Sequence, residues 1–440
     1  MTSDATGTRP EDGVHRARLT REQRLYLLAM TIDNVGNGLW APLALIFFTR
    51  AQHLSLGATG TALTAGGLVG LVAGPLGGSL IDRWGPEWFV LLGNVARAGV
   101  FVTYPVITSP AQVAVATCVF SASDRLFWTA NTPMLARLTP AGDLTRILGA
   151  QNVLRIGGWA AGGGIGAALG GLLIGHASGL HLLAYANAAT YLAAAVLMAA
   201  VRRSVRRPDG SGAAGAGAGA GPGREEEAPG GRRTLSTDRR YQVFCLLQVQ
   251  FALISESLTV MLPLVALDVM HGPSWLPGAA VVTTCLSLVL FQRSAVRYGR
   301  SRSPAHSLRL ACAAFASAFL LLAPAGPLGP SWAVPVVLCA ALVGTAGDAL
   351  FAPVMTAAAH EAAPEELKGR YSAAFQLAWG VAGTLAPVIG ARLMTVGNSV
   401  LWLTMLGGCA VTAPVVGRVL RPPASAPAPE EEASPARSGG

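Results

Sequence analysis

Apolar stretches about as long as a lipid bilayer is thick recur twelve times along the 440-residue chain. A helix needs roughly 20 apolar residues to cross the hydrocarbon core, and hydrocarbon leaves only helices and closed barrels as spanning structures. Only 12% of the residues are charged, against about a quarter in soluble proteins. We therefore predict an all-α integral membrane protein with twelve transmembrane helices. The expected spans lie near 24–48, 57–80, 88–108, 111–136, 147–174, 179–200, 241–267, 275–296, 304–323, 331–357, 370–396 and 399–419.

The chain repeats part of its own sequence at a constant offset in residue number. Residues 116–150 align without a gap with residues 340–374, and ten of these 35 positions are identical. The identities include Asp124 with Asp348 and Pro140 with Pro364, which hydrophobic composition alone does not explain. In an apolar chain such a repeat is typical of a secondary transporter built from two copies of one unit.

The repeat divides the chain into two pseudo-symmetric six-helix bundles. The first bundle is expected over 24–201 and the second over 241–420. Residues 202–240 are rich in Gly, Ala, Pro and charge, so we predict a disordered cytoplasmic linker there. Residues 1–23 and 421–440 are expected to be cytoplasmic tails, the second of them disordered.

Arginine residues gather on alternate loops between the predicted spans. Membrane proteins keep positive loops in the cytoplasm, so this pattern places both termini there and makes the chain a multi-pass protein of the cell membrane. It also explains the net charge of +9 without a nucleic-acid partner. The arginines that set this pattern in the first half are Arg16, Arg18, Arg21, Arg24, Arg83, Arg137 and Arg146.

Motifs for cofactors and catalysis are absent from the sequence. It has no Walker loop, no zinc motif and no nucleophile motif. We expect no enzyme activity, no metal and no cofactor, with a proton gradient as the energy source. The expected partners are a small-molecule substrate and the lipid bilayer, and we expect a monomer.

The loop after the second span reads Gly78-Ser79-Leu80-Ile81-Asp82-Arg83-Trp84-Gly85. It resembles the signature Gly-x-x-x-Asp-Arg-x-Gly that the major facilitator superfamily carries in this loop. The resemblance implies two bundles around a central cavity, and a conformational latch for the outward-facing state made by Gly78, Asp82, Arg83 and Gly85. Pro86-Glu87 stands where the family usually has basic residues, and Val296 replaces Asp in the matching loop, so the latch is expected to be asymmetric.

The fifth span contains a run of glycines similar to the motif Gly-x-x-x-Gly-Pro-x-x-Gly-Gly of the exporter branch. The matching residues are Gly162, Gly166, Gly170 and Gly171, with Ala167 in place of the proline. The resemblance favours export. The alternative is a close helix crossing with no bearing on direction, because small residues allow backbones to meet.

Six charged side chains lie within predicted spans, where each costs about 2.5–3.5 kcal/mol on insertion scales and so tends to serve a function. Apolar surroundings disfavour the charged form of an acid, as a proton carrier requires. We interpret five of the groups as proton-coupling candidates and Arg97 as a structural ion-pair partner. The five candidates are Asp33, Glu256, Arg125, Asp124 and Asp348.

Two of these interpretations have alternatives. Arg125 matches the position of an essential arginine in many proton-linked exporters, although the usual flanking Gln-Gly is absent. It could instead form a buried ion pair with Asp33 or Asp124 that only fixes helix packing. Asp124 and Asp348 occur in both halves, so each could be a helix anchor.

The function most consistent with these features is proton-coupled antiport that exports a small amphipathic or hydrophobic compound, such as a drug or natural product, by alternating access. Asp33 and Glu256 would exchange protons, and Arg125 would adjust their proton affinity. One alternative is a proton-linked importer of a sugar or amino acid. Another is a membrane receptor or scaffold that no longer transports. The predicted substrate contacts are Asn34, Asn37, Trp128, Asn131 and Gln248.

Overall fold

The computed structural model describes residues 19–139, 143–169, 176–205, 238–362 and 368–419, and the regular structure in these ranges is helical. The predicted disorder of the linker and the tails lies largely outside them. Within them, twelve α-helices are long enough to cross a bilayer, and each overlaps one predicted span. In the first half they are α1 (Arg21–Trp40), α3 (Leu56–Trp84), α4 (Pro86–Thr103), α5 (Pro110–Arg137), α6 (Leu144–Ala168) and α8 (Ala177–Val205). In the second half they are α9 (Arg239–Leu264), α10 (Leu276–Ser301), α11 (Pro304–Leu322), α13 (Ala333–Ala362), α14 (Lys368–Val396) and α15 (Asn398–Val419).

Nine of the long helices in the described ranges are apolar enough to cross a membrane, which makes the chain a multi-pass membrane protein. The other three are α1, α5 and α6. These helices carry more polar groups, among them Asp33 on α1, Asp124 and Arg125 on α5, and Arg155 on α6. All three belong to the first half, so the first bundle is the more polar one.

The first helix of each half ends in the same way. Helix α1 continues through η1 (Ala41–Leu43) and α2 (Ala44–Ile46) into the π-turn η2 (Phe47–Ala51), and α9 continues into the π-turn η4 (Val265–Val269). A histidine with positive φ follows each turn, at His53 (φ 53°) and His271 (φ 51°). The short elements α12 (Ala325–Leu328), η3 (Tyr104–Val106) and η5 (Pro330–Trp332) join longer helices elsewhere. The repeated π-turn shows that the sequence repeat is also a structural one.

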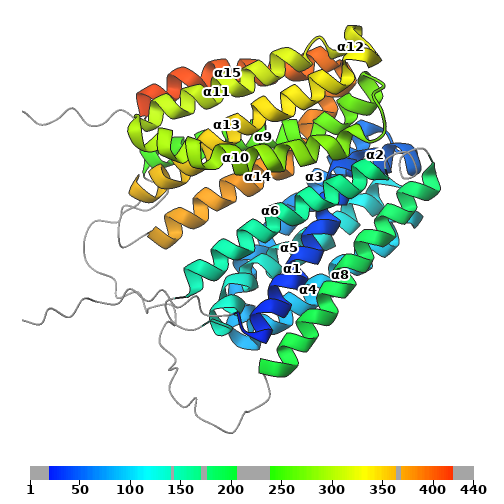
Figure 1. Cartoon of the computed structure of the whole chain (residues 1–440), viewed down its shortest axis with the longest axis vertical. Coiled ribbons are helices and arrows are strands. Elements are labelled where there is room, and N and C mark those ends of the chain that lie inside the picture. The colour runs from blue at the N-terminus through cyan, green and yellow to red at the C-terminus, as the bar shows by residue number, and fades with distance from the viewer. Residues whose placement is uncertain (1–18, 140–142, 170–175, 206–237, 363–367, 420–440) are drawn as a thin grey trace, which may run out of the picture.

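The two halves contact each other mainly through α3 with α14 and α6 with α10 (Figure 1). The Thr64 hydroxyl donates a 2.7 Å hydrogen bond to the Thr384 carbonyl. Gly163 of α6 lies against Gly278 and Val281 of α10, where a Cβ atom would clash. These contacts lie in the first half of α3 and α10 and in the second half of α6 and α14. The halves therefore meet at one end of the molecule.

The same end carries an ion pair between the halves, formed by Arg50 of η2 and Asp268 of η4. Toward the other end α6 and α10 diverge in Figure 1. There Val153 of α6 and Leu290 of α10 are 69% and 72% exposed. We call the first end the closed end and the second the open end.

Candidate functional site

Arg97 of α4 forms a buried ion cluster with two carboxylates of the first half. Its Nη1 lies 3.0 Å from Asp124 Oδ1 on α5, and its Nη2 lies 3.5 Å from Asp33 Oδ2 on α1. Nη2 also donates a 2.8 Å hydrogen bond to Asn94 Oδ1, one turn earlier on α4. Arg97 is only 1% exposed, and burial of a guanidinium at this depth requires such partners.

Two aromatic rings hold the guanidinium in place. Arg97 Cζ lies 4.2 Å from the centre of the Phe127 ring and 4.6 Å from that of Tyr191, which are cation–π contacts. The Tyr191 hydroxyl donates to Asn37 Oδ1 at 2.7 Å, and Asn37 Nδ2 donates to Asp33 Oδ1 at 3.0 Å. The network joins α1, α4, α5 and α8, so it lies within the first bundle.

The cluster pairs one cation with two acids. With both carboxylates ionised it carries one excess negative charge, and with one proton bound it is neutral. Asp33 is 2% exposed, whereas the side chain of Asp124 is 29% exposed. Asp124 is therefore the member of the cluster that solvent reaches most easily.

The expected alternative pairing of Arg125 with Asp33 or Asp124 is wrong, because both acids pair with Arg97. Neighbouring residues on a helix project about 100° apart, so Arg125 points away from the side of α5 that carries Asp124. Arg125 is exposed, and its guanidinium reaches α14 of the second half. A Cβ atom added at Gly380 of α14 would stand 3.1 Å from Arg125 Nη2 and 3.5 Å from its Cζ.

The second half contains an acid pair of its own, Glu256 on α9 and Asp348 on α13. The two carboxylates are close enough to interact electrostatically, and the Ser255 side chain lies near Asp348. The Trp379 indole on α14 lies near Glu256. Among the described residues no salt bridge includes either acid or Arg125. The described part of the second half therefore holds two acids without a bound cation.

Aromatic stacking supports this acid pair from one side. The Trp379 and Phe351 rings stack at 5.8 Å and an angle of 14°, and Phe351 stacks on Phe251 at 4.7 Å. These three rings come from α14, α13 and α9, the helices that carry the acids and the Trp379 indole. The stack fixes the indole beside Glu256.

The predicted substrate contacts do not gather around one open cavity. Asn34 and Asn131 are buried in the first bundle, where they accept hydrogen bonds from Trp159 at 3.1 Å and from Tyr26 at 2.6 Å. Asn37 belongs to the network around Arg97. Gln248 is 1% exposed, and its Oε1 has no partner in the described part of the chain. Trp128 of α5 is the exception, being 39% exposed.

Several polar residues of this network were not predicted. Gln151 donates a 2.9 Å hydrogen bond to Asn131, and Asn94 bonds the Arg97 guanidinium. Tyr26, Tyr191 and Trp159 supply the remaining donors. Their signal in the sequence was weak, because single amides and aromatic rings inside apolar spans are most often packing residues.

Glycines of the exporter-type motif lie at two helix crossings. Gly162 meets the α1 backbone at Val35 and Leu39, while Gly163 beside it meets α10 of the other half. Gly166 faces the Leu39 side chain at 3.4 Å from its would-be Cβ. Gly170 and Gly171 lie outside the described residues. Close packing is thus seen at the described part of the motif, and its relation to transport direction stays a prediction.

The predicted latch lies at the open end of the first bundle. Gly85 has φ +83°, a backbone conformation that side chains disfavour, and ends α3 directly before α4. Arg83 is exposed, and the side chains at 78 and 82 lie outside the described part of the structure. Glu87, which occupies a usually basic position, pairs with Arg137 of α5 at 2.5 Å. This loop therefore has an acid that binds the neighbouring helix within its own half.

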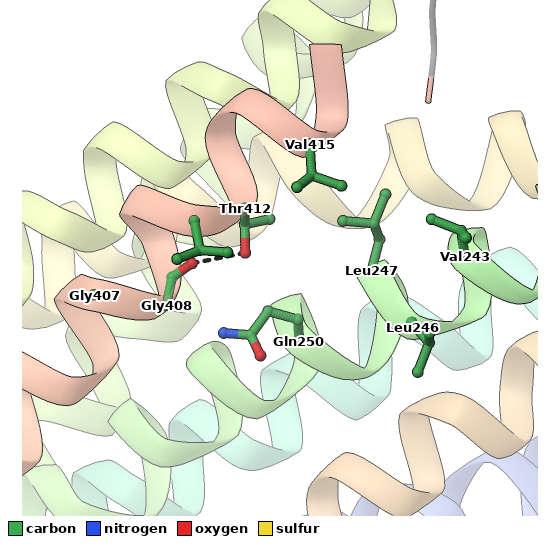
Figure 2. A pocket seen from close by; sticks show the side chains of 9 residues that line it. Val243, Leu246, Leu247, Gln250, Gly407, Gly408, Thr412 and Val415 are labelled. Atoms are coloured by element: carbon green, nitrogen blue, oxygen red, sulfur yellow. Dashed lines mark hydrogen bonds between the residues drawn. The ribbon is translucent and has the colours of Figure 1, made fainter. Parts of the chain in front are cut away.

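A mostly apolar cavity of about 430 Å³ lies between α9 and α15. Figure 2 shows Leu247 and Gln250 of α9 facing Gly408 and Val415 of α15. A Cβ atom at Gly408 would clash with the Gln250 amide, so this glycine admits the side chain. The cavity is separate from the two acid clusters.

Known proteins resemble the chain along most of its length. The family model of the Major Facilitator Superfamily matches residues 25–387 and 274–438. The chain belongs to this superfamily. It is a transporter rather than an enzyme, and proteins of this kind lie in a lipid membrane and bind small-molecule substrates.

One curated relative is the "Multidrug resistance protein MdtH" of Edwardsiella ictaluri (strain 93-146), which is 25% identical over 335 residues, 74% of this chain and 75% of the relative. Among solved structures, the nucleoside transporter NupG matches with a TM-score of 0.70 and 14% identity, over 92% of this chain and all of that one. A bacterial homologue of the iron transporter ferroportin in an inward-facing state matches with a TM-score of 0.69 and 15% identity, over 91% and 99%. These structural matches show the fold of the superfamily.

Proposed function

We propose that the protein is a proton-coupled antiporter that exports a small amphipathic or hydrophobic compound. The observation that carries the proposal is the buried cluster of Arg97 with Asp33 and Asp124. Its excess charge lies in a bundle where unbalanced charge is expensive, so the binding of one proton stabilises it. The acid pair of Glu256 and Asp348 provides a second place for protons in the other half.

Transport proceeds by alternating access between the two halves. The ion pair of Arg50 with Asp268 and the α3–α14 and α6–α10 contacts hold the closed end together. The arginine distribution supports a cytoplasmic open end, and with it an inward-facing conformation of twelve spans in the cell membrane with both termini inside. An exporter would load its substrate in this state.

Substrate chemistry follows from the side chains at the interface of the halves. Trp128 of α5 offers an exposed ring, and aromatic rings favour amphipathic or hydrophobic compounds. The name of the MdtH relative, a multidrug resistance protein, points in the same direction, toward drugs. Asn34, Asn37, Asn131 and Gln248 contact substrate only if the helix packing around them rearranges.

Purified protein in liposomes with an imposed pH gradient tests this proposal. A panel of labelled lipophilic compounds is followed in both directions, and movement should depend on the gradient and oppose the proton flux. Asp33→Asn and Glu256→Gln should each abolish gradient-driven movement. Asp143→Asn is the matched control, because Asp143 forms an exposed pair with Arg146 outside both acid clusters.

Three results contradict the proposal. The first is movement of the compounds that is independent of the gradient. The second is wild-type transport in both Asp33→Asn and Glu256→Gln. The third is uptake of a sugar or amino acid in the direction of the proton flux, which would support an importer.

A further inference from the structure

Arg125 and Glu256 approach one face of α14 from opposite halves of the molecule. Arg125 comes from α5 of the first half, and its guanidinium lies against Gly380, with 3.1 Å between Nη2 and a Cβ placed there. Glu256 comes from α9 of the second half, and its carboxylate carbon lies 3.9 Å from a Cβ placed at Gly383. Positions three apart on a helix are neighbours with Cβ atoms about 5–6 Å apart. The two charged groups are thus no more than roughly 13 Å apart. The Leu71 side chain of α3 also lies against Gly380, with its Cδ2 2.8 Å from a Cβ placed there.

The charges of the two halves are complementary at this place. In the first half Arg97 already pairs with both Asp33 and Asp124, which leaves Arg125 as a cation without an acid among the described residues. In the second half Glu256 faces Asp348, the Ser255 hydroxyl and the Trp379 indole, none of which is a cation. Glu256 and Asp348 are partly buried, and partly buried acids without a cation are unfavourable, so approach of a guanidinium is favourable.

Gly380 lies one turn from Thr384, the residue that contacts α3 at the closed end. Arg125 therefore stands at the edge of the contact between the halves, on the side where they begin to diverge. Movement of α5 toward α14 at this edge would bring its guanidinium to Glu256.

We propose that Arg125 is the counter-cation of Glu256 across the Gly380–Gly383 face of α14, and that their attraction draws the halves together at the open end. Arg125 is then a positioning residue that acts between the halves. The role of this pair in transport rests on the proposed transport cycle. In that cycle, a proton on Glu256 removes the attraction. The attraction itself needs neither a gradient nor a substrate.

A double-mutant cycle on the conformational equilibrium tests the pair. Spin labels at Val153→Cys and Leu290→Cys, in a chain whose six native cysteines are replaced by alanine, report the distance between α6 and α10 at the open end. Arg125→Gln and Glu256→Gln should each lower the ratio of short to long distances by about fivefold. The double variant should lower it no further, and the exchange Arg125→Glu with Glu256→Arg should restore at least half of the loss.

Arg155→Gln is the matched control, since Arg155 is an exposed cation of α6 whose guanidinium bonds Asn152 on its own helix at 2.9 Å. Its effect should add to that of Glu256→Gln. Independent, additive effects of Arg125→Gln and Glu256→Gln overturn the pairing. This outcome is decisive even if the variant with exchanged charges does not fold. Coupling between the two residues without gradient-driven transport in liposomes contradicts only the proposed antiport, whereas transport without coupling contradicts only the pairing.

Discussion

Removal of the Arg97 side chain should destabilise the protein more than any other single substitution in the ion cluster. Methionine at this position keeps much of the volume and is adaptable in shape, but it has no charge. Arg97→Met leaves Asp33, which is 2% exposed, and Asp124, which is 29% exposed, without their cation. It also removes the cation–π contacts with Phe127 and Tyr191.

Breaking a buried ion pair by removing one partner costs about 3–5 kcal/mol, because a charge stays buried without compensation. Most of this penalty should come from Asp33, since water can solvate Asp124. Arg97→Met should therefore lower the free energy of unfolding by about 3–5 kcal/mol. Adding Asp33→Asn should return more than half of the loss, and adding Asp124→Asn should return less. The triple variant should approach wild-type stability, since uncharged replacements of a buried ion cluster are often neutral.

Equilibrium unfolding in mixed micelles of a mild detergent and dodecyl sulfate, followed by circular dichroism, measures these free energies. Arg155→Met is the control, because it removes an exposed arginine and should cost under about 0.5 kcal/mol. Wild-type stability of Arg97→Met would refute the reasoning. Equal rescue by Asp33→Asn and Asp124→Asn would refute the part that depends on their difference in exposure.

Three further substitutions have defined outcomes. Gly162→Ala should cost about 1–3 kcal/mol of unfolding free energy in the same unfolding assay, because its Cβ would clash with the α1 backbone. Gly157→Ala is the control and should cost nothing, because no atom lies within 4 Å of a Cβ placed there. Asp268→Asn breaks the exposed ion pair with Arg50 and should weaken closure of the closed end by at most about 1 kcal/mol. Spin-label distances across that end should shift accordingly, and high salt should produce the same shift in the wild type. Trp128→Ala should raise the KM for hydrophobic compounds in liposomes with little change in folding, and an unchanged KM would remove this ring from the substrate path.

The helices could be predicted from the sequence because their signal is long and local. Each predicted span overlaps one long helix, including α1, α5 and α6, whose polar groups take them below the hydropathy expected of a span. These three spans, like the others, were predicted from the length of their apolar stretches. The fold class depended on the length of the apolar stretches rather than on any single residue.

Pairing among the charged residues could be predicted only in part. Asp124 and Arg125 are adjacent in sequence, which suggested a common role, yet adjacent helical residues point to different sides. Asp124 faces Arg97 inside the bundle, and Arg125 faces the other half. Helical geometry could have separated the two residues, but the choice of Arg97 as the shared cation depends on how α1, α4 and α5 are rotated against each other. No local pattern in the sequence records that rotation.

The offset of the structural repeat shows which acids are equivalent. The sequence repeat of residues 116–150 with residues 340–374 relates Asp124 to Asp348. The first helices of the two halves, α1 and α9, begin at Arg21 and Arg239, which is a slightly smaller offset. This smaller offset also relates Arg50 to Asp268, the two residues that pair across the closed end.

At the offset of the first helices, the counterpart of Glu256 is Gly38, not Asp33. Gly38 packs against the Trp159 backbone, where a Cβ atom would clash, so the first half has no room for an acid at the depth of Glu256. Glu256 therefore lies five positions farther along its helix than Asp33, or about 7–8 Å nearer the closed end. The two halves hold their first-helix acids at different depths. A proton role shown for one of these acids would consequently give no reason, by symmetry, to assign the same role to the other.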